Sequence, residues 1–192
     1  MDGANLKFAA ADNVDVALAY GRQDGGEDTS ENLFIGTVGT SFGVVDANLA
    51  YYNQEQSDAD DTSIFTVGLA TDVAKDLTLS GTYLKADDEN EDGDDDGYAI
   101  GLNYKGAEKT VVGSYGVYAM YNNQPDTTYI AHTTDANIFD TVSGAGGWKG
   151  TTLGVDYTVA KNMVATVNYF DTEALATDDD DQVIMSQLYV FF

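Results

Sequence analysis

Carboxylates are the most abundant residues here that could do chemistry, and they are densest in Asp92-Gly93-Asp94-Asp95-Asp96-Gly97. Acids at the first, third and fifth positions, with glycine at the sixth, match the opening of a calcium-binding loop. The twelfth position is Asn103, where such a loop carries a bidentate glutamate, and residues 98–104 alternate like a strand. The run therefore predicts loose Ca²⁺ binding by Asp92, Asp94 and Asp96, and the alternative is a solvated acidic surface.

Catalytic groups are not apparent. His132 is the only histidine, the chain contains no cysteine, and Ser143 lies in a Val-Ser-Gly-Ala-Gly run that does not match a nucleophile elbow. None of the many carboxylates sits in an apolar context that would raise its pKa for acid–base work. The sequence therefore predicts a protein that is not an enzyme and needs no cofactor.

The overall charge narrows the partners. The 192 residues include 33 acids and 8 bases, which gives a formal charge of −25. Binding to nucleic acid needs clustered Lys and Arg, so nucleic acid is not an expected partner. The absence of cysteine excludes disulfides and thiolate metal sites. No apolar run approaches the roughly 18 residues that a transmembrane helix needs. The first five residues lack the features of a signal peptide, so we expect a mature or trimmed N-terminus.

The acids are unevenly distributed. They concentrate in four segments, Arg22–Glu31, Gln54–Asp61, Asp87–Asp96 and Asp171–Asp181, and charge is sparse between them. Acidity of this kind also occurs in halophilic soluble proteins and in disordered tails. Disorder requires low hydrophobicity, however, and 43% of these residues are hydrophobic. The pattern therefore indicates a folded chain with acidic loops.

Between the acidic segments, apolar residues recur at every second position, which predicts β-strands. The clearest runs are Val14–Gly21, Val45–Tyr52, Phe65–Val73, Tyr98–Tyr104, Leu153–Val159 and Met163–Tyr169. The intervening positions hold mainly Ala, Gly, Ser, Thr and Asn, which suit a hydrated lumen better than the Lys- and Glu-rich surface of a soluble sandwich. Tyrosines recur at the strand ends, as the interfacial girdle of a transmembrane barrel requires.

This alternation assigns two faces. We expect the first face to contact lipid, through Val16, Leu18, Leu69, Ile100, Val155 and Val167. We expect the second to line a pore, through Asp15, Asn48, Thr66, Ser80, Asn103, Asp156 and Asn168, with Arg22 and Lys85 near the rim.

Short and long connections alternate along the chain, as in transmembrane barrels with short periplasmic turns and long outer loops. Lys75, Lys105, Lys109 and Lys161 lie at or beside the short turns. About eleven strands are expected: 5–11, 14–22, 32–42, 45–53, 63–73, 76–86, 97–105, 111–121, 149–159, 163–171 and 183–192. An odd count is unusual for a bacterial barrel. We therefore predict that residues 1–192 form one all-β domain, an antiparallel transmembrane β-barrel that is part of a larger, even-stranded barrel and is N-terminally incomplete.

Two segments raise separate expectations. The Asn122–Lys149 connection is long for a loop without secondary structure, and it either folds into the lumen or caps the barrel against a neighbouring subunit. The last strand ends on aromatic residues. Leu188, Val190 and Phe192 resemble the signal by which outer-membrane barrels are recognised by the barrel-assembly machinery, and the alternative is the edge strand of a soluble protein.

The chain resembles a Gram-negative general porin. More narrowly, Gly113–Tyr121, Gln124-Pro125 and Tyr129–Thr133 resemble the barrel of outer-membrane tether porins of diderm Firmicutes, in which an S-layer-homology domain precedes a trimeric barrel. Val155–Asn162 resembles a strand-turn-strand shared by many porins, and no S-layer-homology segment is visible. The resemblance covers the C-terminal half best. It implies a water-filled, homotrimeric channel in the bacterial outer membrane.

Two functions remain open at this point. The first is passive diffusion of ions and small hydrophilic solutes, with a cation preference set by acidic loops. The expected partners are then the lipid bilayer and lipopolysaccharide. The second is a structural or adhesive surface protein that uses its acidic loops to bind calcium or a partner.

Overall fold

A single curved sheet forms the described part of the chain. The computed structural model describes residues 2–26, 29–55, 61–87, 94–129 and 146–192. Within these ranges no helix has the length and apolar character to cross a membrane.

All eleven strands expected from the sequence are present, together with one 3₁₀ turn. They are β1 (Asp2–Ala11), β2 (Val14–Gly26), β3 (Thr29–Phe42), β4 (Val45–Glu55), β5 (Thr62–Ala74), β6 (Leu77–Ala86), β7 (Asp96–Lys105), β8 (Tyr115–Pro125), η1 (Asp126–Thr128), β9 (Gly147–Ala160), β10 (Met163–Ala174) and β11 (Asp180–Val190).

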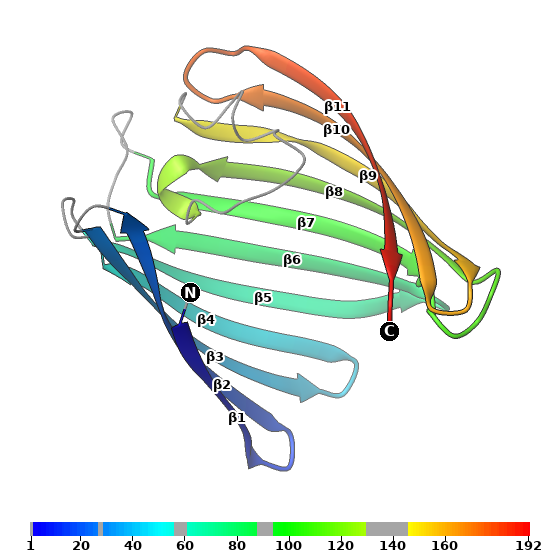
Figure 1. The fold of residues 1–192 in the computed structure, drawn as a ribbon, viewed down its shortest axis with the longest axis horizontal. Helices are drawn as coiled ribbons and strands as arrows, with labels where there is room; N and C mark the ends of the chain where they lie inside the picture. The colour runs from blue at the N-terminus through cyan, green and yellow to red at the C-terminus, as the bar shows by residue number, and fades with distance from the viewer. Residues whose placement is uncertain (1, 27–28, 56–60, 88–93, 130–145) are drawn as a thin grey trace.

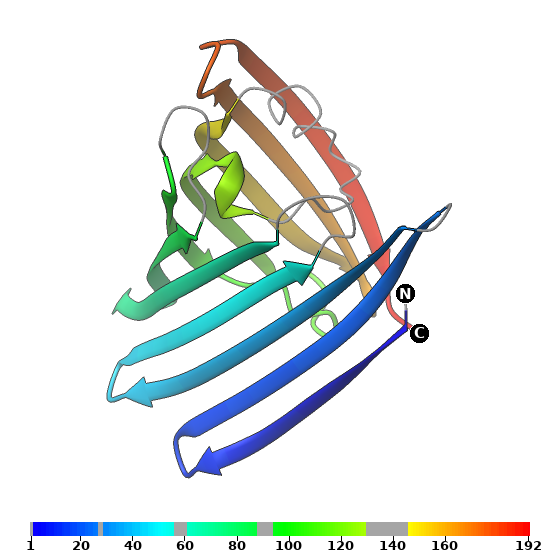
Figure 2. The same cartoon turned by 90° about the vertical axis from the view of Figure 1, so that its left-hand side faces the viewer.

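Every strand is antiparallel to its neighbours in sequence, and the order in the sheet is β1 to β11 without a crossover. The sheet bends through most of a barrel wall but stays open (Figures 1 and 2). In the described residues β1 pairs with β2 and β11 pairs with β10. Because the count is odd, the two edge strands run in the same direction. The prediction of an antiparallel, barrel-type sheet is confirmed.

The convex face of this sheet is apolar and exposed. Leu69, Ile100, Val155 and Val167 are 54%, 51%, 45% and 49% exposed, respectively. The register connects such positions across strands; for example, Val117 lies opposite Val155 and Val155 opposite Val167. A continuous exposed apolar face of this size is expected where lipid, rather than water, is the solvent.

Aromatic side chains mark both edges of this apolar face. Near the long connections they are Tyr20, Phe34, Tyr51, Phe65, Tyr83, Tyr98 and Tyr121, and near the short turns they are Phe8, Phe42, Tyr104, Tyr115 and Tyr157. On β7 and β8 the rings pair across the strands at each edge, with centroids 6.1 Å and 6.4 Å apart. Tyr98 and Tyr104 are separated by roughly 20 Å at about 3.3 Å per residue, which fits an apolar band bounded by two interfaces.

The largest departures from the predicted boundaries are at β2, which continues to Gly26 instead of ending at residue 22, and at β8. β8 begins at Tyr115 rather than at residue 111, because Ser114 ties residues 108–114 into a compact connection. Ser114 Oγ accepts from Glu108 N at 2.8 Å and donates to Val111 O at 2.7 Å. β11 ends at Val190, so Phe192 lies beyond the strand.

Candidate functional site

The concave face is polar and lined by small residues. Seven residues predicted to line a pore share it by strand alternation: Asp15, Asn48, Thr66, Ser80, Asn103, Asp156 and Asn168. Two rows of the register show this directly, because Asn48 lies opposite Gly68, and Asn103 reaches Asn168 through Tyr118 and Gly154. The structure therefore brings these seven residues together on one wall.

Arg22 and Lys85 fall on the other face. Strand alternation continues unbroken from Tyr20 to Arg22 and from Tyr83 to Lys85, so both bases share the convex side with those tyrosines. Lys85 forms a salt bridge with Asp95 at the loop end of the sheet. Their placement thus differs from the predicted one. Both lie at the rim, as expected, but their side chains share the convex face instead of the concave face.

Glycines on the concave wall make room for larger neighbours on the next strand. A Cβ on Gly68 would lie 1.9 Å from Asn48 Oδ1, and one on Gly101 would lie 2.8 Å from Ser80 Oγ. A Cβ on Gly154 would lie 2.1 Å from the Tyr118 ring. The larger side chains therefore lie flat against the wall instead of extending into the space that it encloses.

Tyr118 spans β9 in this way and reaches β10, where its hydroxyl bonds to Asn168 Oδ1. In the next row Thr166 Oγ1 donates to Asp156 Oδ1 at 2.7 Å. Asn168 and Thr166 are each only 7% exposed. Tyr118 was not among the residues predicted to line the pore. It lies between Val117 and Ala119, so strand alternation would have placed it on the concave face.

Substitution of Gly154 by Ala should therefore narrow the space that the concave wall encloses. The new methyl group would overlap the Tyr118 ring, so the ring must rise from the wall and its bond to Asn168 must break. We expect a lower single-channel conductance in a planar bilayer. Gly39→Ala is the matched control, because a Cβ there meets nothing within 4 Å. An equal conductance for both variants would contradict this account of the wall.

The described part of the Asn122–Lys149 connection turns inward. Residues 122–125 extend β8, and η1 follows with contacts to β5 through β9. Figure 2 shows η1 within the curve of the sheet. Thr128 is 1% exposed and lies over Gly97, where a Cβ would come within 3.1 Å of its Oγ1. The start of this connection therefore lies against the concave wall, while residues 130–145, including His132 and Ser143, lie outside the described residues.

Just after η1, Tyr129 packs against buried Trp148 and Ala174. Burial, with the nearby charge of Asp126 as a smaller cause, raises the pKa of Tyr129 to about 12. The phenol thus stays neutral at physiological pH, and this small apolar cluster anchors the connection at the loop end of the wall.

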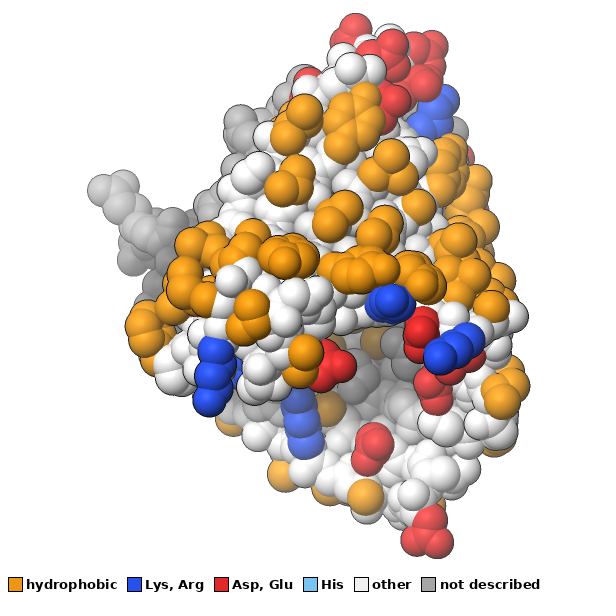
Figure 3. Space-filling view, turned by 90° about the vertical axis from the view of Figure 1, so that its right-hand side faces the viewer, with side chains coloured by type: hydrophobic (Ala, Val, Ile, Leu, Met, Phe, Trp, Pro, Cys, Tyr) orange, Lys and Arg blue, Asp and Glu red, His pale blue; other side chains and the backbone are white. Residues whose placement is uncertain are grey.

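Charged side chains lie at both ends of the sheet. At the loop end Lys149 Nζ lies 2.7 Å from Glu173 Oε1, and Lys85 pairs with Asp95. Asp92 falls outside the described residues, Asp94 precedes β7, and Asp96 is the first residue of that strand. Among the residues that the structure places, no group of three His, Cys or carboxylate residues is arranged to hold a metal ion. At the short-turn end, charged side chains surround a hollow, with apolar side chains over the adjoining surface (Figure 3).

The last strand carries Leu188 and Val190 on its convex face, 55% and 46% exposed, and Phe192 follows outside it. Their role in recognition by an assembly machinery stays a prediction.

Comparison with known families supports the interpretation of the concave face as the lining of a channel. The family model described as Gram-negative porin matches residues 2–127, which include β1 to β8 and the start of η1. A search of curated proteins finds no match. A sheet with an apolar convex face, two aromatic girdles and a polar concave wall has the architecture that such a family requires. The chain belongs to the Gram-negative porin family.

Proposed function

We propose that this protein is a passive diffusion channel of the outer membrane that favours cations and small hydrophilic solutes. The observation that carries the proposal is the polar concave wall behind an apolar, girdled convex face. Asn48, Ser80, Asn103 and Asp156 supply hydrogen-bonding groups to permeating water and solutes, and buried Asn168 holds Tyr118 against the wall. The wall offers a polar path and a field rather than a reaction centre.

Closure of the path requires partners for both sheet edges. Unpaired backbone groups facing lipid cost several kcal/mol each, so β1 and β11 must be paired in the membrane. We infer that the eleven strands belong to a larger, even-stranded barrel, in which an odd number of additional strands would pair antiparallel with both edges. The narrower resemblance of Gly113–Tyr121 to tether porins supports a homotrimer within the lipid and lipopolysaccharide of the outer membrane. Loose Ca²⁺ binding at Asp92, Asp94 and Asp96 is part of the same proposal.

The cation preference follows from the net charge of −25 and from the concentration of acids in the long connections. Carboxylates at a channel mouth attract counterions within about a Debye length, roughly 8–10 Å at physiological salt. The preference for cations should therefore fade as ionic strength rises.

We expect Asp94→Asn with Asp96→Asn to lower the cation-to-anion permeability ratio, measured as the reversal potential across a planar bilayer under a salt gradient. This pair leaves Asp95 to hold Lys85. The matched control is Asp12→Asn with Asp76→Asn, which removes two exposed carboxylates from the short-turn end. The loop-end pair should have the larger effect, and only at low salt. Anion selectivity of the unaltered protein, or a cation preference indifferent to salt, would contradict the proposal.

A further inference from the structure

The lysines at the two ends of the sheet have different partners. At the loop end Lys85 and Lys149 each pair with a carboxylate. In the described ranges no such ion pair joins any of the four lysines near the short turns, Lys75, Lys105, Lys109 and Lys161. Two of them, Lys105 and Lys109, instead lie over aromatic rings of the chain, 4.7 Å from the ring centre of Tyr115 and 4.8 Å from that of Phe191, so each ammonium keeps N–H groups that an anion from outside the chain can accept.

Lys105 is the most precisely positioned of these four. Its φ of 56° is left-handed, which is uncommon for a residue other than glycine, and Lys105 N donates to Asp76 O at 2.7 Å. Regular alternation would direct this side chain inward, away from Tyr104. The left-handed backbone instead lets the ammonium lie 5.2 Å from the Tyr104 ring centre and 4.7 Å from that of Tyr115. Lys105 Nζ also donates to Tyr115 Oη at 3.3 Å. The charge is thereby held at the aromatic girdle.

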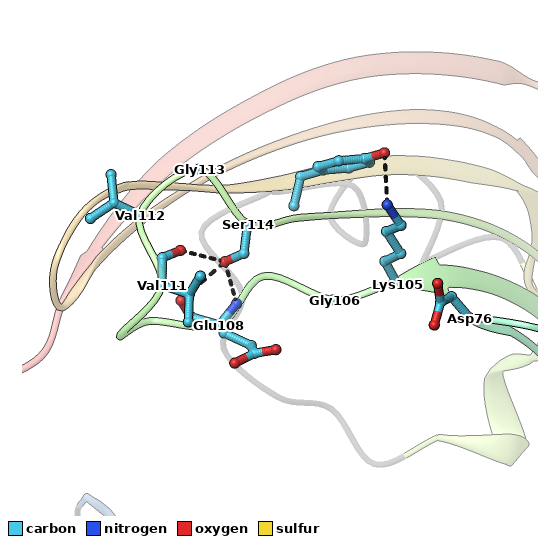
Figure 4. A pocket seen from close by; sticks show the side chains of 9 residues that line it. Asp76, Lys105, Gly106, Glu108, Val111, Val112, Gly113 and Ser114 are labelled. Carbon is cyan, nitrogen blue, oxygen red and sulfur yellow. Dashed lines mark hydrogen bonds between the residues drawn. The ribbon is translucent and has the colours of Figure 1, made fainter.

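A pocket of about 530 Å³ opens beside this ammonium. Asp76, Glu108, Val111 and Val112 line it together with Lys105 and Tyr115 (Figure 4). Residues 108–114 form one side of the pocket. Ser114 holds this segment in place, because its Oγ lies within hydrogen-bonding distance of Glu108 N and Val111 O. Val111 and Val112 are 49% and 60% exposed. The pocket thus combines one cation, two carboxylates and an exposed apolar wall at the edge of the membrane-facing surface.

We propose that this pocket binds the phosphoethanolamine headgroup of a membrane phospholipid, an inference that rests on the membrane-spanning role proposed above. The Lys105 ammonium contacts the lipid phosphate. Asp76 and Glu108 accept hydrogen bonds from the lipid ammonium, and Val111 and Val112 contact the acyl region.

The chemistry of the pocket selects this headgroup over the common alternatives. An anionic headgroup without an amine would place its charge beside two carboxylates with nothing to offset them. A choline headgroup has no N–H to donate to those carboxylates, and Lys105 already lies over the aromatic rings that would attract its methyl groups. A primary ammonium beside a phosphate satisfies all three charged side chains.

The test is native mass spectrometry of the full chain in detergent, with an equimolar mixture of phosphatidylethanolamine, phosphatidylcholine and phosphatidylglycerol of identical acyl chains. We expect preferential retention of phosphatidylethanolamine. Lys105→Gln should reduce its retention about tenfold, the loss expected for one charge-assisted contact. Lys105→Arg should preserve retention and shows that the rim still folds. Glu108→Gln and Asp76→Asn should shift the preference towards phosphatidylglycerol.

Lys85→Gln is the matched control, since it removes a lysine that is already paired at the other end. Equal retention of the three lipids, or equal losses for Lys105→Gln and Lys85→Gln, would overturn the proposal. Displacement of the lipid by soluble phosphoethanolamine at comparable concentration would show that the headgroup alone is bound, which overturns the lipid source. Conductance measured in parallel separates the two claims, because a protein that conducts without lipid preference keeps its channel function and loses only this site.

Discussion

Val155→Arg should lower the free energy of unfolding in lipid vesicles by about 2–4 kcal/mol, the usual cost of an arginine on the lipid face near mid-membrane. Val155 is 45% exposed on the convex face and lies between Val117 and Val167 in the register. Its neighbour Asp156 lies at the same depth on the concave wall. Asp156→Arg should cost only about 1 kcal/mol, chiefly through loss of the hydrogen bond from Thr166.

The adjacent pair matches depth, strand and the introduced side chain. A larger loss for Val155→Arg, despite the hydrogen bond that Asp156→Arg removes, therefore reports the face that each residue occupies. The measurement is urea-induced unfolding from vesicles, followed by the fluorescence of Trp148, the only tryptophan. Equal costs for the two variants would mean that both faces of β9 meet the same solvent, and the assignment of lipid and lumen would fail.

Gly147→Ala should destabilise the protein by about 2–5 kcal/mol, because two penalties combine at one residue. The φ of 104° disfavours any side chain, which costs about 1–2 kcal/mol. A Cβ there would also lie 2.3 Å from Gln124 O and 2.5 Å from Pro125 Cα, so the backbone of β8 would have to move. That movement should cost about 1–3 kcal/mol more.

Gly113→Ala separates these two penalties. Gly113 also has a positive φ, of 88°, but the only atom near a new Cβ is Tyr157 Oη at 3.9 Å. This control should lose about 1–2 kcal/mol, the backbone part alone. Thermal unfolding followed by circular dichroism measures both. A Gly147→Ala variant no less stable than Gly113→Ala would show that β8 and β9 are not held together closely at Pro125.

The sequence predicted the strands well because alternation with a period of two is a local property of each segment. It predicted the start of β8 less well, since residues 111–114 contain apolar residues that read as strand. Their conformation is decided by the Ser114 hydrogen bonds and by the link from Gly113 N to Thr158 O, 2.9 Å long. Contacts of that kind join distant parts of the chain and leave no periodic pattern.

The residues of the concave wall could be predicted for the same reason. The alternation of side chains along each strand is enough to place Asp15, Asn48 and Asn168 on one face of the sheet. The residues at the strand ends were harder to place. Lys85 was expected to line the pore near its rim, whereas strand alternation places its side chain on the convex face. Lys105 could not be placed by alternation, because its left-handed φ changes the direction of its side chain. No neighbouring residue type predicts that φ. The inward course of η1 depends on contacts with β5 to β9, which sequence spacing does not encode.

The unbroken order from β1 to β11 also has a consequence for assembly. Each strand pairs with the next strand along the chain, so no step requires a segment to pair across an intervening strand. Doubling a loop adds only about 0.6 kcal/mol of closure entropy, so even the span between β8 and β9 is a small additional barrier. The wall can therefore grow one hairpin at a time, with the newest edge strand as the template for the next and no rearrangement of the strands already laid down.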